Sequence, residues 1–334
     1  MNSAPETSDS PPAGALTAPQ RIQKFLRKTP EERRATARFF ATMWLAKLPY
    51  APHRVQLRIA PKESVKFWWS YFPPSFSPDR SAFEYWGDDI GDLRFLWRHL
   101  QPGMTFLDIG AYHGVYSVVA AKKLGRGGRV VAFEPSPRER QRMNLHLRYN
   151  GIKSVTLEPY ALAAQEGEAS LSVVVDGFTT MNSLRPPPMD QATKQVKVET
   201  MSLDAYLDRE HIDRVDFMKI DTEGGEVDAF RGADRLLRGI RPLIICEVLD
   251  LVTRSWGYPA ADIIRLIREY DYEWFDILAD GTPRPHQPKE EYKIVKNYLA
   301  VPTEKRSLLW SDVTCAEGDD IQLAEKRDDQ NRDT

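Results

Sequence analysis

Short apolar runs alternate with amphipathic segments over residues 104–301. Apolar runs of four to eight residues are typical of buried strands, whereas apolar positions at helical spacing are typical of helices that cover a sheet. The pattern predicts strands at 104–109, 128–133, 154–158, 215–220, 243–248, 272–277 and 292–301, and helices at 115–124, 138–149, 227–237 and 260–270. Repeated strand–helix units of this kind predict an α/β fold with a doubly wound, mostly parallel seven-stranded sheet.

Two segments depart from this alternation. Residues 169–175 and 195–201 alternate apolar and polar positions, as half-exposed strands do, and a Pro-rich loop lies between them. The sequence therefore predicts an antiparallel hairpin inserted after the third strand.

The ends of the chain have a different composition. Residues 1–20 are rich in Ser, Pro, Ala and Thr, which predicts a disordered tail. Residues 21–84 are predicted to form an N-terminal cap that begins with an amphipathic helix at 21–48. An aromatic segment at 67–86, interrupted by prolines, either lines a pocket or only covers the core. The α/β domain is expected at 85–303 and a polar C-terminal tail at 304–334, disordered from 314 onward.

Composition narrows the class of protein. The 334 residues are 42% hydrophobic and 28% charged, and the net charge of −2 argues against a broad basic face for nucleic acid. Two cysteines, Cys246 and Cys315, exclude a disulfide scaffold and a cysteine-built zinc site. No signal peptide or membrane span is evident, so we expect a cytoplasmic protein. The basic helix at 21–48 either touches a membrane or, as we favour, packs on the main domain.

The first candidate ligand site is the turn after the first predicted strand. Asp108, Gly110 and Gly114 have the spacing D-x-G-x-x-x-G, which differs from the G-x-G-x-x-G of dinucleotide sites. Glycines let a backbone approach a ligand closely. A carboxylate at the mouth of the sheet repels a pyrophosphate and suits a ligand that carries an ammonium group.

The second candidate is Glu134, at the end of the second predicted strand. An acid in this position accepts hydrogen bonds from ribose hydroxyls in doubly wound folds. An adenosine that bears an amino acid instead of a diphosphate satisfies both features, and that ligand is S-adenosylmethionine. The alternative role of Glu134 is a helix-entry cap before Pro135.

The third candidate is a group of acids at the ends of two adjacent predicted strands. Asp221, Glu223 and Glu226 follow the fourth strand, and Glu247 ends the fifth. We expect Asp221 and Glu247 to face each other, where they hold a divalent cation or accept a proton from an attacking hydroxyl. The alternative is that Glu223 and Glu226 only favour the start of the next helix through its dipole.

Taken together, the motifs at 108–117, 132–135 and 219–226 resemble those of the FkbM-type methyltransferases, with shorter echoes at 203–204 and 230–233. The resemblance runs from about residue 86 to residue 301 and implies the class I methyltransferase fold. It also implies S-adenosylmethionine as cofactor and hydroxyl oxygens as acceptors. The family usually has Asn where this chain has Tyr112, so an expected side-chain amide contact is absent.

The resemblance implies that Asp108, Gly110, Gly114 and Glu134 contact the cofactor. Our candidate cofactor set is therefore Asp108, Gly110, Ala111, Tyr112, Gly114, Glu134, Tyr160 and Ala161. The candidate catalytic residues are Asp221, Glu223 and Glu247, with His113 as a further base candidate and Asp221 and Glu247 as candidate metal ligands. The loop at 178–184 binds the acceptor, covers the adenosine or is only a surface loop.

We therefore expect an S-adenosylmethionine-dependent O-methyltransferase acting on a sugar, a glycoside or another small natural product such as a polyketide or lipid. Aromatic rings in the segment 67–86 favour a sugar because they offer stacking surfaces. The alternative is a non-catalytic binding or scaffold protein of the same fold. A nicotinamide-dependent oxidoreductase is disfavoured because the pyrophosphate-binding glycine loop is missing, and a nucleic-acid methyltransferase because of the acidic balance.

Overall fold

The computed structural model describes residues 53–60, 63–69, 90–175, 179–310 and 322–324. The chain divides into two units, Met1–Ala51 and Pro52–Thr334, and the described residues all belong to the second. The predicted tail at 1–20 and helix at 21–48 lie outside the described residues, as does the aromatic segment from residue 70 to residue 86.

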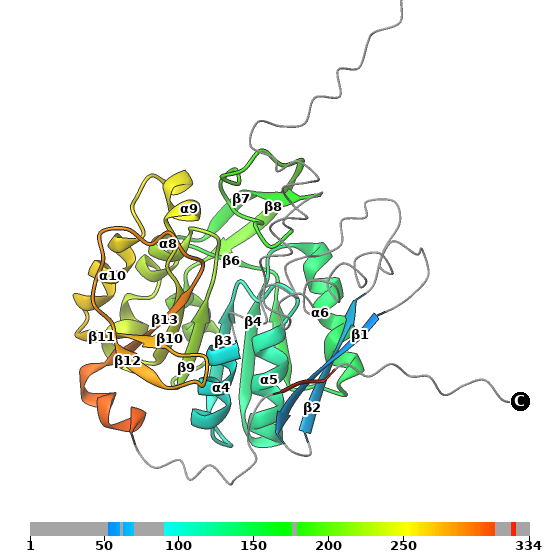
Figure 1. Ribbon diagram of the computed structural model, residues 1–334. Coiled ribbons are helices and arrows are strands. Elements are labelled where there is room, and N and C mark those ends of the chain that lie inside the picture. The colour runs from blue at the N-terminus through cyan, green and yellow to red at the C-terminus, as the bar shows by residue number, and fades with distance from the viewer. Residues whose placement is uncertain (1–52, 61–62, 70–89, 176–178, 311–321, 325–334) are drawn as a thin grey trace, which may run out of the picture. The chain divides into compact units, whose positions relative to one another are not determined.

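The second unit is built around a sheet of eight strands in the order β12-β11-β13-β10-β9-β3-β4-β5 (Figure 1). The strands β5, β4, β3, β9 and β10 are parallel, whereas β13 is antiparallel to both β10 and β11. Their bounds are β3 Thr105–Ile109, β4 Arg129–Phe133, β5 Val155–Glu158, β9 Phe217–Ile220, β10 Leu243–Glu247, β11 Tyr272–Ile277, β12 Pro283–Pro285 and β13 Asn297–Pro302. The seven predicted strands are confirmed, although the last begins at Asn297 rather than residue 292, and β12 adds a short eighth strand at the edge.

Alternate residues of each strand divide between two apolar layers. Phe106 and Val130 belong to the layer under helices α4, α5 and α6, while Leu107 and Val131 belong to the layer under α7, α8 and α10. The helices are α4 Ile90–His99, α5 Val115–Leu124, α6 Pro137–Tyr149, α7 Leu203–Arg209, α8 Glu226–Arg231, α9 Asp250–Thr253 and α10 Ala261–Arg268. Because side chains alternate across a strand, a strand buried on both faces reads as an unbroken apolar run.

The predicted helix at 227–237 is wrong in extent, because it breaks at Gly232. A Cβ at this position would lie 2.3 Å from the Ala163 carbonyl oxygen. The carboxylate of Asp204 then accepts the backbone N–H groups of Arg235 and Leu236, and a new helical turn, Leu236–Ile240, follows. The backbone N–H of Asp204 also donates to the carbonyl of Gly232 at 2.9 Å, so the family-like segments 203–204 and 230–233 contact each other.

The predicted antiparallel insertion is confirmed. Strand β7, Gly167–Val174, pairs antiparallel with β8, Thr193–Met201, and the two-residue strand β6, Ala161–Leu162, joins β8 in parallel. The hairpin follows β5, as the alternating pattern predicts.

A second small sheet was not predicted. Strand β1, His53–Ala60, pairs antiparallel with β2, Glu63–Trp69, and also with β14, Gln322–Ala324. The expectation of a disordered C-terminus from residue 314 is therefore wrong at β14, where pairing with a distant strand supplies backbone hydrogen bonds that local composition does not reveal.

Short helical segments complete the described chain. These are Gly125–Gly127, Arg254–Trp256 and Thr303–Leu309. Residues 303–309 begin the tail predicted at 304–334, and Leu309 is buried in the apolar layer of α5. No helix among the residues that the structure describes is both long and apolar enough to cross a bilayer.

Candidate active site

The loop between β3 and α5 contains three residues with positive φ. These are Gly110 at 74°, Tyr112 at 49° and Gly114 at 77°. A Cβ at Gly110 would lie 1.7 Å from the backbone oxygen of Asp221, and one at Gly114 would lie 2.7 Å from the side chain of Met143. The glycines therefore allow close approach of the protein's own chain, in addition to any approach of a ligand.

Asp108 connects β3 to the first turn of α5. Its Oδ2 accepts hydrogen bonds from the backbone N–H of Ser117 at 2.9 Å and from the Ser117 hydroxyl at 2.6 Å. Burial raises the pKa of Asp108 to about 6, and the bonds from Ser117 oppose that rise. These two hydrogen bonds fix the first turn of α5 relative to the end of β3.

Glu134 connects the end of β4 to the same loop. Its Oε2 accepts the backbone N–H of Tyr112, and its Oε1 accepts that of Ser136, both at 2.8 Å. Burial, and then the charge of Glu139, raises the pKa of Glu134 to about 8. In the ionised form each carboxylate oxygen can accept two hydrogen bonds, so each oxygen of ionised Glu134 keeps a further acceptor position.

His113 is held away from the acid group at β9 by another partner. Its Nε2 lies 2.7 Å from Oε2 of Glu139, a buried residue of α6, and its ring stacks on that of Tyr112 with centroids 3.6 Å apart. Burial opposes ionisation of Glu139, but the hydrogen bond and charge of His113, with Arg138 and Arg142, lower its pKa to about 2. His113 is therefore hydrogen-bonded to Glu139 of α6.

Tyr160 and Ala161 follow β5, the next strand beyond β4. Ala161 is buried in β6 and pairs with Thr200. The Tyr160 hydroxyl accepts a hydrogen bond from Arg209 at 3.3 Å, and the Arg209 guanidinium lies 5.1 Å from the Tyr160 ring centroid. Both candidate residues thus follow the carboxyl end of β5, and the Tyr160 side chain contacts α7.

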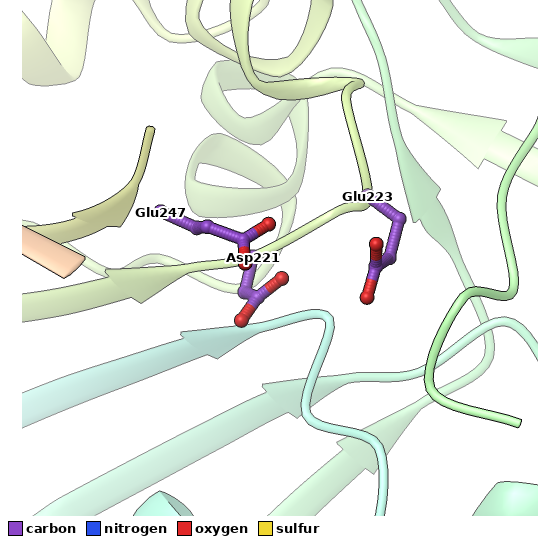
Figure 2. A group of neighbouring side chains, drawn as sticks. All are labelled: Asp221, Glu223 and Glu247. Atoms are coloured by element: carbon purple, nitrogen blue, oxygen red, sulfur yellow. The ribbon is translucent and has the colours of Figure 1, made fainter. Parts of the chain in front are cut away.

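Asp221, Glu223 and Glu247 meet at the carboxyl ends of β9 and β10. Each offers a carboxylate oxygen, and these oxygens all lie within 4.8 Å of one another. Figure 2 shows the three side chains directed toward one another from the end of β9, the following loop and the end of β10. The parallel pairing of Ile220 with Cys246 places the next residues side by side, so the predicted meeting of Asp221 and Glu247 is confirmed.

The three carboxylates are unequal in exposure. Glu247 is 3% exposed and Glu223 is 9% exposed, whereas the side chain of Asp221 is 27% exposed. Burial, and then repulsion from neighbouring carboxylates, raises the pKa of both Glu223 and Glu247 well above the usual value. Lys219, itself buried, places Nζ 3.1 Å from Oδ2 of Asp221. Asp221 is therefore the carboxylate that an incoming molecule meets most readily.

Glu226 has the structural role that a helix-start acid predicts. Its Oε1 accepts the backbone N–H groups of Thr222 and Gly224 and the hydroxyl of Thr222. It thereby holds the loop between β9 and α8, where Glu223 has a φ of 54°.

The site also includes residues 179–183 of the candidate loop at 178–184 and one side chain that was missed in the sequence, Trp256. The indole Nε1 of Trp256 donates to the Ser183 hydroxyl at 3.2 Å and to the Glu223 carbonyl at 3.3 Å. Ser183 also donates to that carbonyl at 2.9 Å, and Thr179 forms a 2.7 Å hydrogen bond with the Tyr112 hydroxyl. The hairpin segment 179–183 therefore touches both the glycine loop and the acid-bearing loop. Trp256, an isolated aromatic residue after a short helix, carries no sequence signal for this contact.

The comparisons with known proteins agree with the motifs. The model of the Methyltransferase FkbM domain family matches residues 108–274. A search of curated proteins gives no match.

The matches among solved structures have low identities and TM-scores below 0.5. The methyltransferase FkbM from Methylobacillus flagellatus KT is 19% identical, with a TM-score of 0.40, over 60% of this chain and 44% of that chain. The O-methyltransferase TomG from Streptomyces achromogenes, involved in tomaymycin synthesis and solved with SAM, is 16% identical with a TM-score of 0.38 over 64% and 79% of the two chains. An O-methyltransferase from Bacillus cereus, solved with SAH, is 15% identical with a TM-score of 0.36 over 67% and 80%.

Proposed function

The chain belongs to the FkbM methyltransferase family, and we propose that it transfers the methyl group of S-adenosylmethionine to a hydroxyl oxygen of a sugar, a glycoside or another small natural product. The observation that carries this proposal is the position of Asp221. Its backbone oxygen contacts Gly110 of the glycine loop, and its carboxylate lies beside those of Glu223 and Glu247. A cofactor on the loop and a hydroxyl beside the acids would therefore be neighbours.

The glycine loop and Glu134 have the chemistry that an adenosyl cofactor requires. Glu134 keeps an acceptor position on each oxygen, which suits the two hydroxyls of a ribose, and it is fixed by backbone N–H groups on both sides. Asp108 is engaged with Ser117, so we assign it to positioning the loop. The remaining candidate contacts are Gly110, Ala111, Tyr112, Gly114, Tyr160 and Ala161.

The carboxylates can take up the proton that the methylated hydroxyl must lose. When bound, the cofactor supplies a methyl group already activated on a sulfonium, so the protein must align the hydroxyl and remove its proton. Asp221 is the most exposed of the three carboxylates, and its pairing with Lys219 fixes its orientation. We assign the proton acceptance to Asp221, with Glu223 and Glu247 beside it.

The acceptor class rests on a different part of the chain. The preference for a sugar comes from the aromatic segment 67–86, most of which lies outside the described residues. The expectation that nucleic acid is not a partner likewise rests on composition.

The experiment that tests the proposal is calorimetric titration of S-adenosylmethionine and NAD into the wild-type protein and into Glu134→Ala. We expect S-adenosylmethionine to bind, NAD not to bind, and the variant to lose about 1.5–3 kcal/mol of binding free energy, the value of hydrogen bonds to a charged group. Transfer of labelled methyl groups to a panel of hydroxylated compounds follows. Wild-type protein without affinity for S-adenosylmethionine would overturn the proposal.

The second candidate function is a non-catalytic member of the family. Tyr112 favours it, because its hydroxyl is engaged with Thr179 and offers no amide to a cofactor. Cofactor binding without methyl transfer to any acceptor would support this alternative.

A further inference from the structure

The buried charges around β9 and β10 do not balance. Four carboxylates, those of Asp221, Glu223, Glu226 and Glu247, influence one another electrostatically. The positive charge of Lys219 acts on Glu223 and Glu247, and its ammonium pairs with Asp221. Four negative groups and one ammonium leave a formal charge of −3 when all are ionised. Lys219 also acts on Asp108 and Asp92, so its positive charge is shared more widely.

Glu247 adds a separate observation. Its residue is 3% exposed, and its Oε2 has no hydrogen-bond partner among the residues that the structure describes. Figure 2 shows its carboxylate directed toward Asp221 and Glu223. A buried carboxylate oxygen without a donor is costly, and a cation compensates it as well as a hydrogen bond does.

The geometry points to a site for one hard divalent cation, Mg²⁺ or Mn²⁺, held by the carboxylates of Asp221, Glu223 and Glu247. Carboxylate oxygens are the ligands that such ions prefer, and water completes their coordination. The ligand oxygens lie within 4.8 Å of one another, a span that one ion bridges after small side-chain movements. Glu226 is left out of the ligand set because its carboxylate is not in the group of oxygens that meet within 4.8 Å. Its Oε1 holds the β9–α8 loop, and its Oε2, like that of Glu247, has no hydrogen-bond partner among the described residues.

The positions of the three ligands give the cation a function. Asp221 is the exposed ligand and adjoins the glycine loop, so the open side of the ion faces the acceptor. A cation there binds the acceptor hydroxyl and favours its ionised form. This role rests on the proposed function, whereas binding of the ion does not.

The experiment is titration of Mn²⁺ into the full-length protein without cofactor, with free Mn²⁺ measured by electron paramagnetic resonance. We expect one Mn²⁺ per chain, displaced by Mg²⁺. Glu247→Gln and Asp221→Asn should each weaken binding at least tenfold. Glu158→Gln is the matched control, since it removes a carboxylate from the carboxyl end of β5 on the same sheet and should bind Mn²⁺ as the wild type does.

Thermal unfolding separates loss of the site from loss of the fold. Mn²⁺ should raise the Tm of the wild type and leave that of Glu247→Gln unchanged. If Glu247→Gln does not fold, Glu223→Gln, on the loop, provides the same comparison. The inference is overturned if the wild type binds no Mn²⁺ or Mg²⁺ at about millimolar concentration, or if the folded variants bind as tightly as the wild type.

Measuring Mn²⁺ binding and S-adenosylmethionine binding on the same protein preparation distinguishes this inference from the proposed function. Binding of S-adenosylmethionine without any binding of Mn²⁺ would overturn the cation site and leave the methyltransferase proposal standing; the carboxylates would then hold protons. A protein that binds Mn²⁺ but not S-adenosylmethionine would support the cation site and overturn the methyltransferase proposal.

Discussion

Individual buried carboxylates in this protein are compensated in different ways. Asp108 accepts two hydrogen bonds from Ser117, and Glu134 accepts two from backbone N–H groups. Glu247, by contrast, has an oxygen without a donor among the described residues. Asp108 and Glu134 are thus held by fixed donors, whereas Glu247 combines burial with an oxygen that remains available for a ligand or a proton.

Glu134 should make the stability of the cofactor-free protein depend on pH. Its pKa in the folded state, about 8, lies above the usual value of 4.5. Burial and the charge of Glu139 raise this pKa, whereas the charge of Arg140 lowers it. The folded state therefore binds the proton more tightly, and this contribution is present below pH 4.5 and lost as the pH rises through 8. Between about pH 6 and pH 9 the wild type should lose roughly 2–3 kcal/mol more stability than Glu134→Gln, at about 1.36 kcal/mol per pKa unit.

Urea unfolding at both pH values measures this difference. Other titrating groups are common to the two proteins and cancel in the comparison. Equal losses in wild type and variant would show that Glu134 is ionised throughout.

Asp221→Asn should separate catalysis from cofactor binding. The variant keeps the size of the side chain but cannot accept a proton, so methyl transfer should fall by about 10²–10⁴-fold, the usual contribution of a general base. The affinity for S-adenosylmethionine should change by less than about threefold. Glu273→Gln, at an acid of β11 that pairs with Arg306, should keep wild-type activity.

Initial rates of methyl transfer and calorimetric affinities, measured on the same preparations, give the two readouts. A variant that loses cofactor affinity and rate together would place Asp221 in the cofactor site instead.

At the scale of elements, the site depends on the packing of three loops. The glycine loop after β3 contacts the end of β9, the loop after β9 is held by Glu226 and Trp256, and the hairpin segment 179–183 touches both. The contact of Gly110 with Asp221 is the tightest of these, since a Cβ would lie 1.7 Å from a backbone atom. A backbone atom cannot move aside as a flexible side chain does.

Gly110→Ala should therefore destabilise the protein by roughly 3 kcal/mol, the sum of a left-handed backbone penalty and overpacking. Gly151→Ala is the matched control, because Gly151 also has a positive φ, 65°, and nothing lies within 4 Å of its Cβ position. That variant should lose about 1–2 kcal/mol. Urea denaturation compares them, and equal losses would contradict the predicted clash.

At the scale of the whole molecule, the described core belongs to the second unit. The buried apolar residues of its three clusters run from Val65 to Leu309, and the central sheet lies between two of these clusters. A unit with its own core can fold without a neighbouring segment.

Removal of Met1–Ala51 should therefore leave the Tm of the remaining chain within a few degrees of the wild-type value. Its affinity for S-adenosylmethionine should also be retained, because the candidate cofactor residues all lie in the second unit. Calorimetric melting and titration test this, and a shortened chain without a cooperative transition would contradict it.

The sequence alone determined the layered α/β fold, because buried strands and covering helices have different apolar periods, which can be read without knowing the tertiary contacts. It also placed Asp108, Glu134, Asp221 and Glu247 at one edge, since the carboxyl ends of parallel strands lie together. Tertiary structure alone decided the pairing of β14 with β1, the break at Gly232, the binding of His113 to Glu139 and the support of Glu223 by Ser183 and Trp256. Those contacts join residues far apart in the chain, and no local pattern records which distant partner a strand, a ring or a hydroxyl will meet.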